Sequence, residues 1–151
     1  MRSLRVTLVV LLAVWLLPAP ALPQEGKTFE KTGKISAEPI KLGWKSSGCA
    51  VERVTPKNYP SGEDIDHARN EDRDDKTWLW WEFYVTNDGG KQCRVQFWID
   101  VMDKGGQVVK SSDRSGSLDH DERDDEFRVS TLVRTLDIVE GSVRLRAEIR
   151  Q

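Results

Sequence analysis

The stretch Asp75–Asp88, DKTWLWWEFYVTND, holds three of the six tryptophans of the 151-residue chain. Side chains of a β-strand point alternately to its two faces. The odd-numbered positions form an unbroken apolar face of Leu79, Trp81, Phe83 and Val85. The even-numbered positions carry Trp78, Trp80, Glu82 and Tyr84. We therefore expect a strand whose odd-numbered face is buried, and the open point is what covers the even-numbered tryptophans.

The next segment, Cys93–Met102, alternates in the same way. Its odd-numbered positions are Cys93, Val95, Phe97, Ile99 and Val101, and its even-numbered ones are Arg94, Gln96, Trp98 and Asp100. We expect the two segments to pair as an antiparallel hairpin through a loop of residues 88–90, with Gly90 in the left-handed conformation. Matching core positions with core positions places Asn87 opposite Lys91, Trp80 opposite Trp98 and Trp78 opposite Asp100.

This register predicts an aromatic cluster on the outer face of the hairpin, made of Trp78, Trp80, Tyr84 and Trp98. Two explanations of the cluster stay open. In the first, the N-terminal third of the chain covers it with Trp44, Tyr59 or Phe29 as a lid. In the second, the cluster is exposed and binds a flat apolar group, such as a sugar ring or part of a partner protein, because exposed aromatic patches mark interaction sites.

Other segments also alternate with period two. They are Ile40–Trp44, Cys49–Val54, Phe127–Leu132 and Val143–Arg150. Clusters of Gly, Ser, Asp and Asn separate these runs, for example NYPSGED at 58–64 and SDRSGS at 112–117. Short alternating runs between turn signals are typical of an all-β, immunoglobulin-like antiparallel β-sandwich. We assign it to residues 35–151.

The start of the chain has the composition of an export signal. Arg2 and Arg5 precede an apolar run from Val6 to Leu17, and small residues at Ala19 and Ala21 fit a cleavage site. The run is shorter than the about 20 residues that span a bilayer. We expect a cleaved signal peptide over 1–21, a flexible N-terminal arm over 22–34, a periplasmic or secreted protein, and no membrane insertion after cleavage.

The charge balance excludes some classes of partner. Removal of residues 1–21 takes away two of 23 basic residues, which leaves 21 basic and 25 acidic residues and a net charge of −4. Nucleic acids and anionic membranes select for basic surfaces. We therefore expect neither as a partner.

Two cysteines, Cys49 and Cys93, remain in the mature chain. In an oxidising compartment an even pair indicates a disulfide bond, here closing a long loop worth about 4 kcal/mol in the chain-entropy model. Two buried free thiols are the alternative. No C-x-x-C motif supports a redox role.

Two segments, 62–76 and 119–126, are strongly acidic. Oxygen-rich loops suit calcium, and Asp72 and Asp74 are spaced like the start of an EF-hand loop, although the Gly and Glu that complete that loop are missing. A solvated, salt-bridged loop is the alternative. Strand direction places the two segments at opposite ends of the sandwich, with Asp103, Asp137 and Glu140 near the first. His67 and His120, one in each segment, then cannot share a metal ion.

The run VTNDGGKQCRVQFWIDVMDKGGQVV resembles FxLYD-type and similar bacterial immunoglobulin-like domains. The matching features are Asn87 in a turn, the strand 95–101, Asp103 with Gly106, and the pair Val108–Val109. The resemblance covers residues 78–150 at most, and Val101-Met102-Asp103 replaces the Leu-Tyr-Asp core of the family. It implies a binding or spacer module without catalytic residues.

The chain also has no nucleophile elbow, H-E-x-x-H motif, phosphate loop or dinucleotide fingerprint. We expect no enzyme and no cofactor other than the calcium considered above. The expected function is an exported, non-catalytic binding module for a protein partner. The alternative is carbohydrate binding through Trp78, Trp80 and Trp98.

Overall fold

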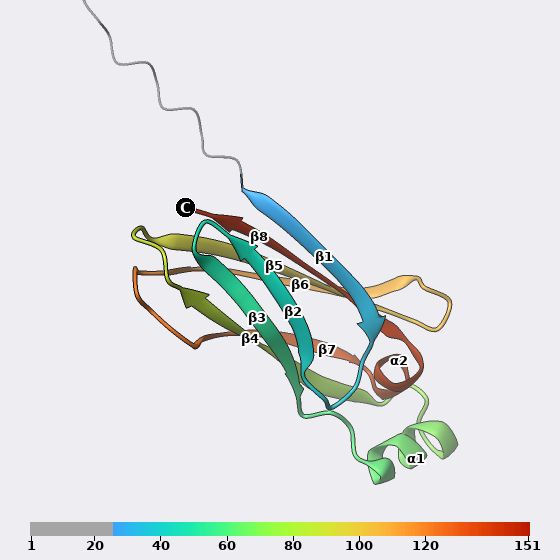
Figure 1. Ribbon diagram of the computed structural model, residues 1–151. Coiled ribbons are helices and arrows are strands. Elements are labelled where there is room, and N and C mark those ends of the chain that lie inside the picture. Colours follow the sequence, from blue (N-terminus) through green and yellow to red (C-terminus); the bar gives the residue numbers. More distant parts are fainter. Residues whose placement is uncertain (1–25) are drawn as a thin grey trace, which may run out of the picture.

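Two antiparallel four-stranded β-sheets pack face to face in the computed structural model, which describes residues 26–151 (Figure 1). Sheet A has the strand order β1-β8-β5-β6, and sheet B has the order β2-β3-β4-β7. The strands of sheet A are β1 (Lys27–Lys34), β8 (Ser142–Arg150), β5 (Cys93–Met102) and β6 (Val108–Leu118). Those of sheet B are β2 (Ile40–Ser46), β3 (Cys49–Lys57), β4 (Lys76–Asn87) and β7 (Asp125–Arg134). The predicted antiparallel β-sandwich is confirmed, while the predicted signal peptide lies outside the described residues.

The predicted burial of odd-numbered side chains is confirmed for both central strands. Phe83 of β4 and Phe97 of β5 are fully buried, and their rings stack with centroids 4.1 Å apart. The predicted hairpin, however, is wrong. Residues 88–92 carry the chain from sheet B to sheet A, so that β4 and β5 face each other across the core instead of pairing edge to edge. The alternation of apolar and polar residues determines only which face of a strand is buried. A hairpin and two strands that face each other across the core both satisfy this alternation.

The turn after β4 also differs from the prediction. Gly90 does not adopt the left-handed conformation, whereas Gly48, in the neighbouring β2–β3 turn, does so with φ 83°. A Cβ atom on Gly48 would lie 2.7 Å from the Cα of Gly89, so the two turns approach more closely than a side chain allows.

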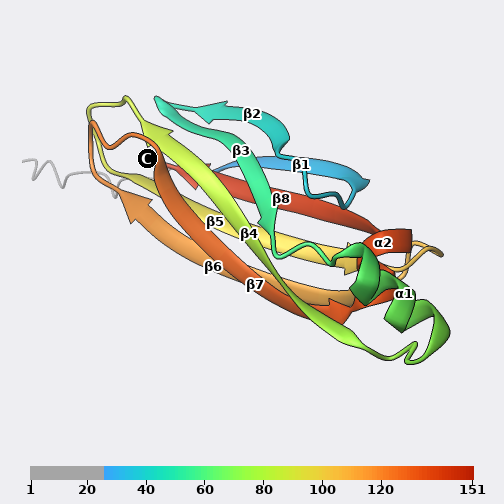
Figure 2. The ribbon, with the colours of Figure 1, turned by 90° about the horizontal axis from the view of Figure 1, so that it is seen from below.

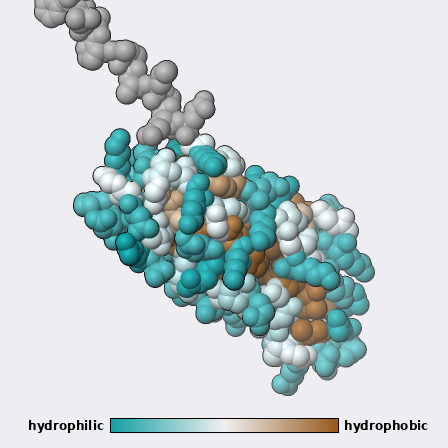
Figure 3. Space-filling view, viewed as in Figure 1, coloured by the Kyte–Doolittle hydropathy of each residue, from teal (hydrophilic) through white to brown (hydrophobic). Residues whose placement is uncertain are grey.

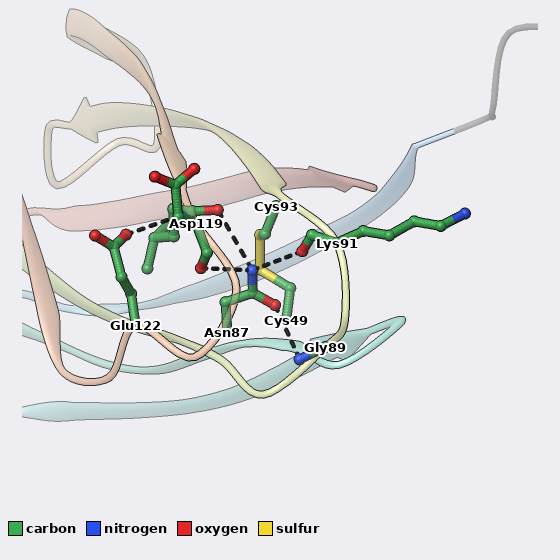
Figure 4. The surroundings of a disulfide bond; sticks show 8 residues. Cys49, Asn87, Gly89, Lys91, Cys93, Asp119 and Glu122 are labelled. Atoms are coloured by element: carbon green, nitrogen blue, oxygen red, sulfur yellow. Dashed lines mark hydrogen bonds between the residues drawn. A yellow bond between two sulfur atoms is a disulfide. The ribbon is translucent and has the colours of Figure 1, made fainter.

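The disulfide bond joins the two sheets near this turn (Figure 4). Cys49 of β3 and Cys93 of β5 are both fully buried, with Cα atoms 6.1 Å apart. Beside the bond, the buried Asn87 donates through Nδ2 to the carbonyls of Lys91 at 2.8 Å and Asp119 at 2.9 Å. The predicted disulfide is confirmed. Asn87 ties two crossing loops together by its side chain and is not a strand partner of Lys91.

Strand β1 replaces most of the predicted flexible arm. Lys27–Lys34 pairs with β8 along its whole length, so the expectation of an arm over 22–34 is wrong from residue 27 onward. Residues 22–25 lie outside the described part of the chain. The strand has a single apolar residue, Phe29, and it is held by backbone pairing to β8, whose inner face already supplies apolar residues.

On each open side of the sandwich, a cationic side chain from an edge strand of sheet A donates a hydrogen bond to sheet B. Lys31 of β1 points inward and donates to the carbonyl of Lys41 in β2 at 2.7 Å. Arg114 of β6 donates to the carbonyl of Arg128 in β7 at 3.2 Å. Inward-pointing charges on edge strands hinder pairing with other chains. Figure 3 shows the β1–β2 side, where hydrophobic surface is visible between hydrophilic side chains.

Two short helices, α1 (Gly62–Asn70) and α2 (Thr135–Glu140), lie together at one end of the sandwich (Figure 2). α1 begins with a capping box, in which the Ser61 hydroxyl accepts from the Asp64 N–H and Asp64 accepts from the Ser61 N–H. The segment predicted as an acidic loop therefore begins as a helix. Within residues 26–151 no helix is long and apolar enough to span a membrane.

Candidate binding faces

Trp78 and Trp80 lie on the outer face of sheet B, next to each other on β4. Trp78 is 51% exposed and Trp80 is 37% exposed. Trp78 pairs with Leu132 of β7, and Trp80 lies between Lys57 of β3 and Ser130 of β7. We call the surface of Trp78, Trp80 and Leu132 the indole face. It lies toward the end of the sandwich at which α1 and α2 are found.

The indole face ends at the next pair of strand positions. Glu82 is buried although it points outward, because Arg128 donates to it at 2.7 Å and the Lys57 ammonium lies 3.7 Å away. Beyond it, the Arg53 guanidinium stacks over the ring of Tyr84, 3.9 Å from its centroid. Tyr84 lies on the outer face of sheet B, as predicted, and is half-buried under this cation. Because Glu82 and its ion pairs lie between Tyr84 and Trp80, Tyr84 is not part of the indole face.

Trp98 lies on the opposite side of the molecule from the indole face. It pairs with Asp113 of β6 and Arg146 of β8 in sheet A, whereas Trp80 belongs to sheet B. The predicted pairings of Trp80 with Trp98 and of Trp78 with Asp100 are wrong, because β4 and β5 belong to different sheets. The structure therefore separates the predicted cluster into two surfaces.

None of the three aromatic residues considered as lids covers the indole face. Trp44 is buried in the core, and Phe29 stacks on it with centroids 5.9 Å apart, on the β1–β2 side of the sandwich. Tyr59 also packs against the core. Of the two explanations of the aromatic residues, exposure is the correct one for Trp78 and Trp80.

A hollow of about 500 Å³ lies beside Trp98 on the outer face of sheet A. Three neighbouring strands line it with the outward side chains of Arg94, Gln96 and Trp98 from β5, Ser115 and Ser117 from β6, and Glu148 and Arg150 from β8. We call it the Trp98 hollow. The hollow exists because the outward side chains of β6 are short, whereas those of β5 and β8 are long. Apart from Trp98, sequence reasoning missed these residues as a site, because β5 was paired with the wrong strand.

Asp100 is a buried carboxylate on the same outer face. One of its oxygens accepts from Arg144 at 2.7 and 3.0 Å and from Arg146 at 3.0 Å, and the other accepts from Ser111 at 2.7 Å. Burial alone would raise the pKa of Asp100, but the hydrogen bonds from Ser111 and Arg144 and the charges of Arg146 and Arg144 outweigh it and hold the pKa below its ordinary value of 3.8. Arg144 and Arg146, which lie on the outer face of β8, therefore share Asp100 as a structural partner.

The two acidic segments lie at opposite ends of β4, as predicted. The first leads into β4 at Lys76, and the second meets its far end, where the Asn87 N–H donates to the Glu122 carbonyl at 2.8 Å. Asp103, Asp137 and Glu140 surround a hollow together with Arg73 of the first segment, which also agrees with the prediction.

The structure gives Asp72 and Asp74, the predicted calcium ligands, a local role. The side chain of Asp72 accepts from the Asp74 N–H at 3.0 Å and so closes the turn that follows α1. His67 pairs with Glu71 at 3.2 Å within the helical segment. Across residues 26–151 no three His, Cys, Asp or Glu side chains are grouped so that they could hold a metal ion. Calcium binding stays a prediction without geometric support.

Comparisons with known proteins give no functional assignment. No model of a known protein family matches the chain, and a search of curated proteins finds no significant match. The resemblance of residues 78–150 to FxLYD-type domains therefore stays a prediction.

Proposed function

We propose that this protein is an exported, non-catalytic binding module that docks a protein partner on its indole face. The observation that carries the proposal is the exposure of Trp78 and Trp80, side by side on a rigid central strand of sheet B. Tryptophan is among the residues most enriched at the centres of protein interfaces. The sandwich does not need these two side chains for its core, which the odd-numbered face of β4 already fills.

The exposed area of the two indoles fits an anchor at the centre of a larger interface. The two indoles leave on the order of 200 Å² of aromatic surface in water. Its burial is worth up to about 5 kcal/mol before the costs of association. A stable interface buries about 800 Å² on each partner, so neighbouring polar residues must form its rim.

The rim of the indole face is rich in cations. Lys57, Lys76, Arg128 and Arg134 occupy outward positions around the two tryptophans. Arg128 and Arg134 are ion-paired to Glu82 and Asp137 but keep about half of their side chains exposed. The complementary surface is therefore an apolar pocket or ridge with acidic side chains at its edge.

Within residues 26–151, two carboxylates whose pKa values are lowered have structural partners. The pKa of Asp64 is held below its ordinary value of 3.8 by the hydrogen bonds from the Ser61 side chain and backbone, and Asp100 is held low as described above. Both groups are ionised at neutral pH and engaged in a helix cap or an ion pair.

The buried disulfide supports the proposed location. Disulfides persist in oxidising compartments, which fits an extracellular or periplasmic protein. The export signal expected over residues 1–21 gives the same location. Amino-terminal sequencing of the secreted or periplasmic protein tests it, with cleavage after Ala21 as the expected result.

A site-specific cross-link tests the docking surface. A benzophenone amino acid is placed at position 130, which lies beside Trp80 and leaves both tryptophans intact, and at position 109 on the edge of sheet A as the matched control, in the organism that makes the protein. A partner cross-linked from position 130 only is then purified and titrated by calorimetry. We expect Trp78→Ala and Trp80→Ala each to weaken binding about 30-fold, the size of an interface hot spot.

The control variant for the titration is Trp98→Ala, which removes an indole from the other sheet. It should change the affinity less than threefold, and all variants are first compared by circular dichroism and melting point. Equal affinity for wild type and Trp80→Ala overturns the proposal, as does a cross-link that joins two copies of this chain. Saturable fluorescence quenching by a neutral oligosaccharide, lost in Trp78→Ala, replaces the protein partner by the carbohydrate alternative.

A further inference from the structure

We propose that the Trp98 hollow is a second binding site, and that it takes an acidic oligosaccharide built from hexuronic acid residues. A sugar ring stacks on Trp98 and a carboxylate is held by Arg94. The inference does not rest on the protein-docking function, because the hollow lies on the other sheet and shares no residue with the indole face.

The side chains of the hollow form three rows across three strands. The first row is Arg150, Arg94 and Ser117, the second is Glu148, Gln96 and Ser115, and the third is Arg146, Trp98 and Asp113. Rows two residues apart are separated by about 7 Å, and neighbouring strands by about 4.8 Å. The surface from the indole to the two arginines is therefore about 14 Å long and about 10 Å wide, an elongated shape that suits a short chain of rings.

Trp98 is held in place at one end of the hollow. The Arg146 guanidinium lies over its ring, 5.8 Å from the centroid, and the same guanidinium is fixed by its hydrogen bond to the buried Asp100. The indole is half-buried and has lost much of its freedom before a ligand arrives. Pre-organisation of this kind reduces the entropy cost of binding.

The other end of the hollow carries positive charge. Arg150 shares its charge with Glu148, 2.7 Å away. Arg94 is exposed, and within residues 26–151 no carboxylate lies within ion-pair distance of its guanidinium. The lining thus has two arginines and one glutamate, in a chain whose overall charge is negative. A guanidinium with free donors binds a carboxylate through two parallel hydrogen bonds.

The middle of the hollow offers groups that suit hydroxyls. Gln96 donates through Nε2 to Asp113 at 3.0 Å, which leaves its Oε1 atom free to accept. The exposed hydroxyls of Ser115 and Ser117 can both donate and accept. Along its length the hollow offers first an aromatic ring, then neutral polar groups and then a cation. These match the ring face, the hydroxyls and the carboxylate of a uronic acid. An acidic peptide offers the carboxylate but lacks ring hydroxyls for the middle row.

Calorimetric titration with defined oligosaccharides tests the site. The probes are unesterified oligogalacturonate, oligoguluronate and hyaluronan fragments, and the matched ligand control is methyl-esterified oligogalacturonate. We expect at least one acidic probe to bind with an affinity that falls as salt is added. Removal of its charge by esterification should weaken binding at least tenfold.

Variants locate the site on the molecule. Arg94→Gln and Trp98→Ala should each weaken binding at least tenfold. Ser117→Glu, an exposed change that leaves both residues in place, should abolish it by repulsion. Lys45→Gln, which removes an exposed positive charge from sheet B, should leave it unchanged.

Several outcomes overturn the proposal. These are no binding of any acidic probe at millimolar concentration, equal binding by folded Arg94→Gln and wild type, and equal binding of the esterified probe. Binding of a hexaglutamate peptide that requires Arg94 but not Trp98 also overturns it, because the site is then a carboxylate site for peptides. Failure here leaves the cross-linking result at position 130 unaffected, so the two proposals are tested separately.

Discussion

Arg144 donates two hydrogen bonds to a single carboxylate oxygen of Asp100, from Nε at 3.0 Å and from Nη2 at 2.7 Å. The second carboxylate oxygen accepts from Ser111 of β6. Asp100 thereby links β5, β6 and β8 on the outer face of sheet A. A carboxylate that is 4% exposed is stable only with such partners, because an unpaired buried charge costs several kcal/mol.

Replacement of this carboxylate should destabilise the fold. We expect Asp100→Asn to lower the free energy of unfolding at neutral pH by about 2 kcal/mol, the loss of hydrogen bonds to a charged group. The loss is moderate because water reaches the two arginines, which are about one third exposed. Urea denaturation measures the change, with Asp113→Asn as the control on the same face. A difference between the two variants below about 0.5 kcal/mol contradicts the structural role.

The ion pair of Asp100 with Arg144 also predicts that the stability of the fold depends on pH. The pKa of Asp100 is lower in the folded state than its ordinary value of 3.8, so its contribution to stability is present above that value and is lost as the pH falls through the folded-state pKa. The stability gap between wild type and Asp100→Asn should therefore be constant above about pH 5 and shrink below about pH 4. Urea midpoints of both proteins across this range measure the gap. A gap that widens in acid runs against the prediction.

The disulfide should stabilise the sandwich and resist reduction in the folded state. It closes a separation of 44 residues, worth about 4 kcal/mol in the chain-entropy model, so Cys49→Ala with Cys93→Ala should lower the unfolding free energy by about 3–5 kcal/mol. Both cysteines are fully buried, so a reductant should react only after unfolding. Mass analysis after alkylation, in native buffer and in concentrated urea, checks this. Rapid labelling in native buffer contradicts it.

Alternation in the sequence determined which side chains form the core, but not which strands pair. Phe83 and Phe97 were both expected to be buried, and both are. A single sheet and a pair of facing sheets bury the same odd-numbered positions, and the two differ only in the course of the loop at 88–92. The buried Asn87 ties that loop to the segment after β6 and so marks the crossing, but its partner in that segment, Asp119, is distant in the sequence.

The candidate sites depended on strand pairing more strongly than the fold did. The outward position of Trp78, Trp80 and Trp98 followed from parity alone. The neighbours of each indole could be predicted only from the strand order, which places Leu132 beside Trp78 and Arg146 beside Trp98. The short serines of β6 that line the Trp98 hollow belong to the run 112–117, which we predicted as a break between strands. That prediction is wrong, because the run lies within strand β6 and pairs with β5.

Two glycines of the edge strands of sheet A should respond oppositely to the same substitution. Both point to the inner face, Gly116 opposite Val95 and Gly33 opposite Val143. A Cβ atom on Gly116 would lie 2.7 Å from Cδ1 of Phe127 and 3.0 Å from its Cζ, whereas a Cβ on Gly33 would meet nothing within 4 Å. Gly116→Ala should therefore cost about 1–3 kcal/mol by overpacking, and Gly33→Ala should be neutral or stabilise by up to about 1 kcal/mol.

A double-mutant cycle separates this collision from a general effect of alanine on the edge strand. In a Phe127→Leu background the Gly116→Ala cost should fall by more than half, because the smaller side chain no longer meets the new methyl group. Thermal or urea unfolding of the four proteins measures the coupling. An unchanged cost in that background means that the destabilisation arises from strand β6 itself and not from its packing against Phe127.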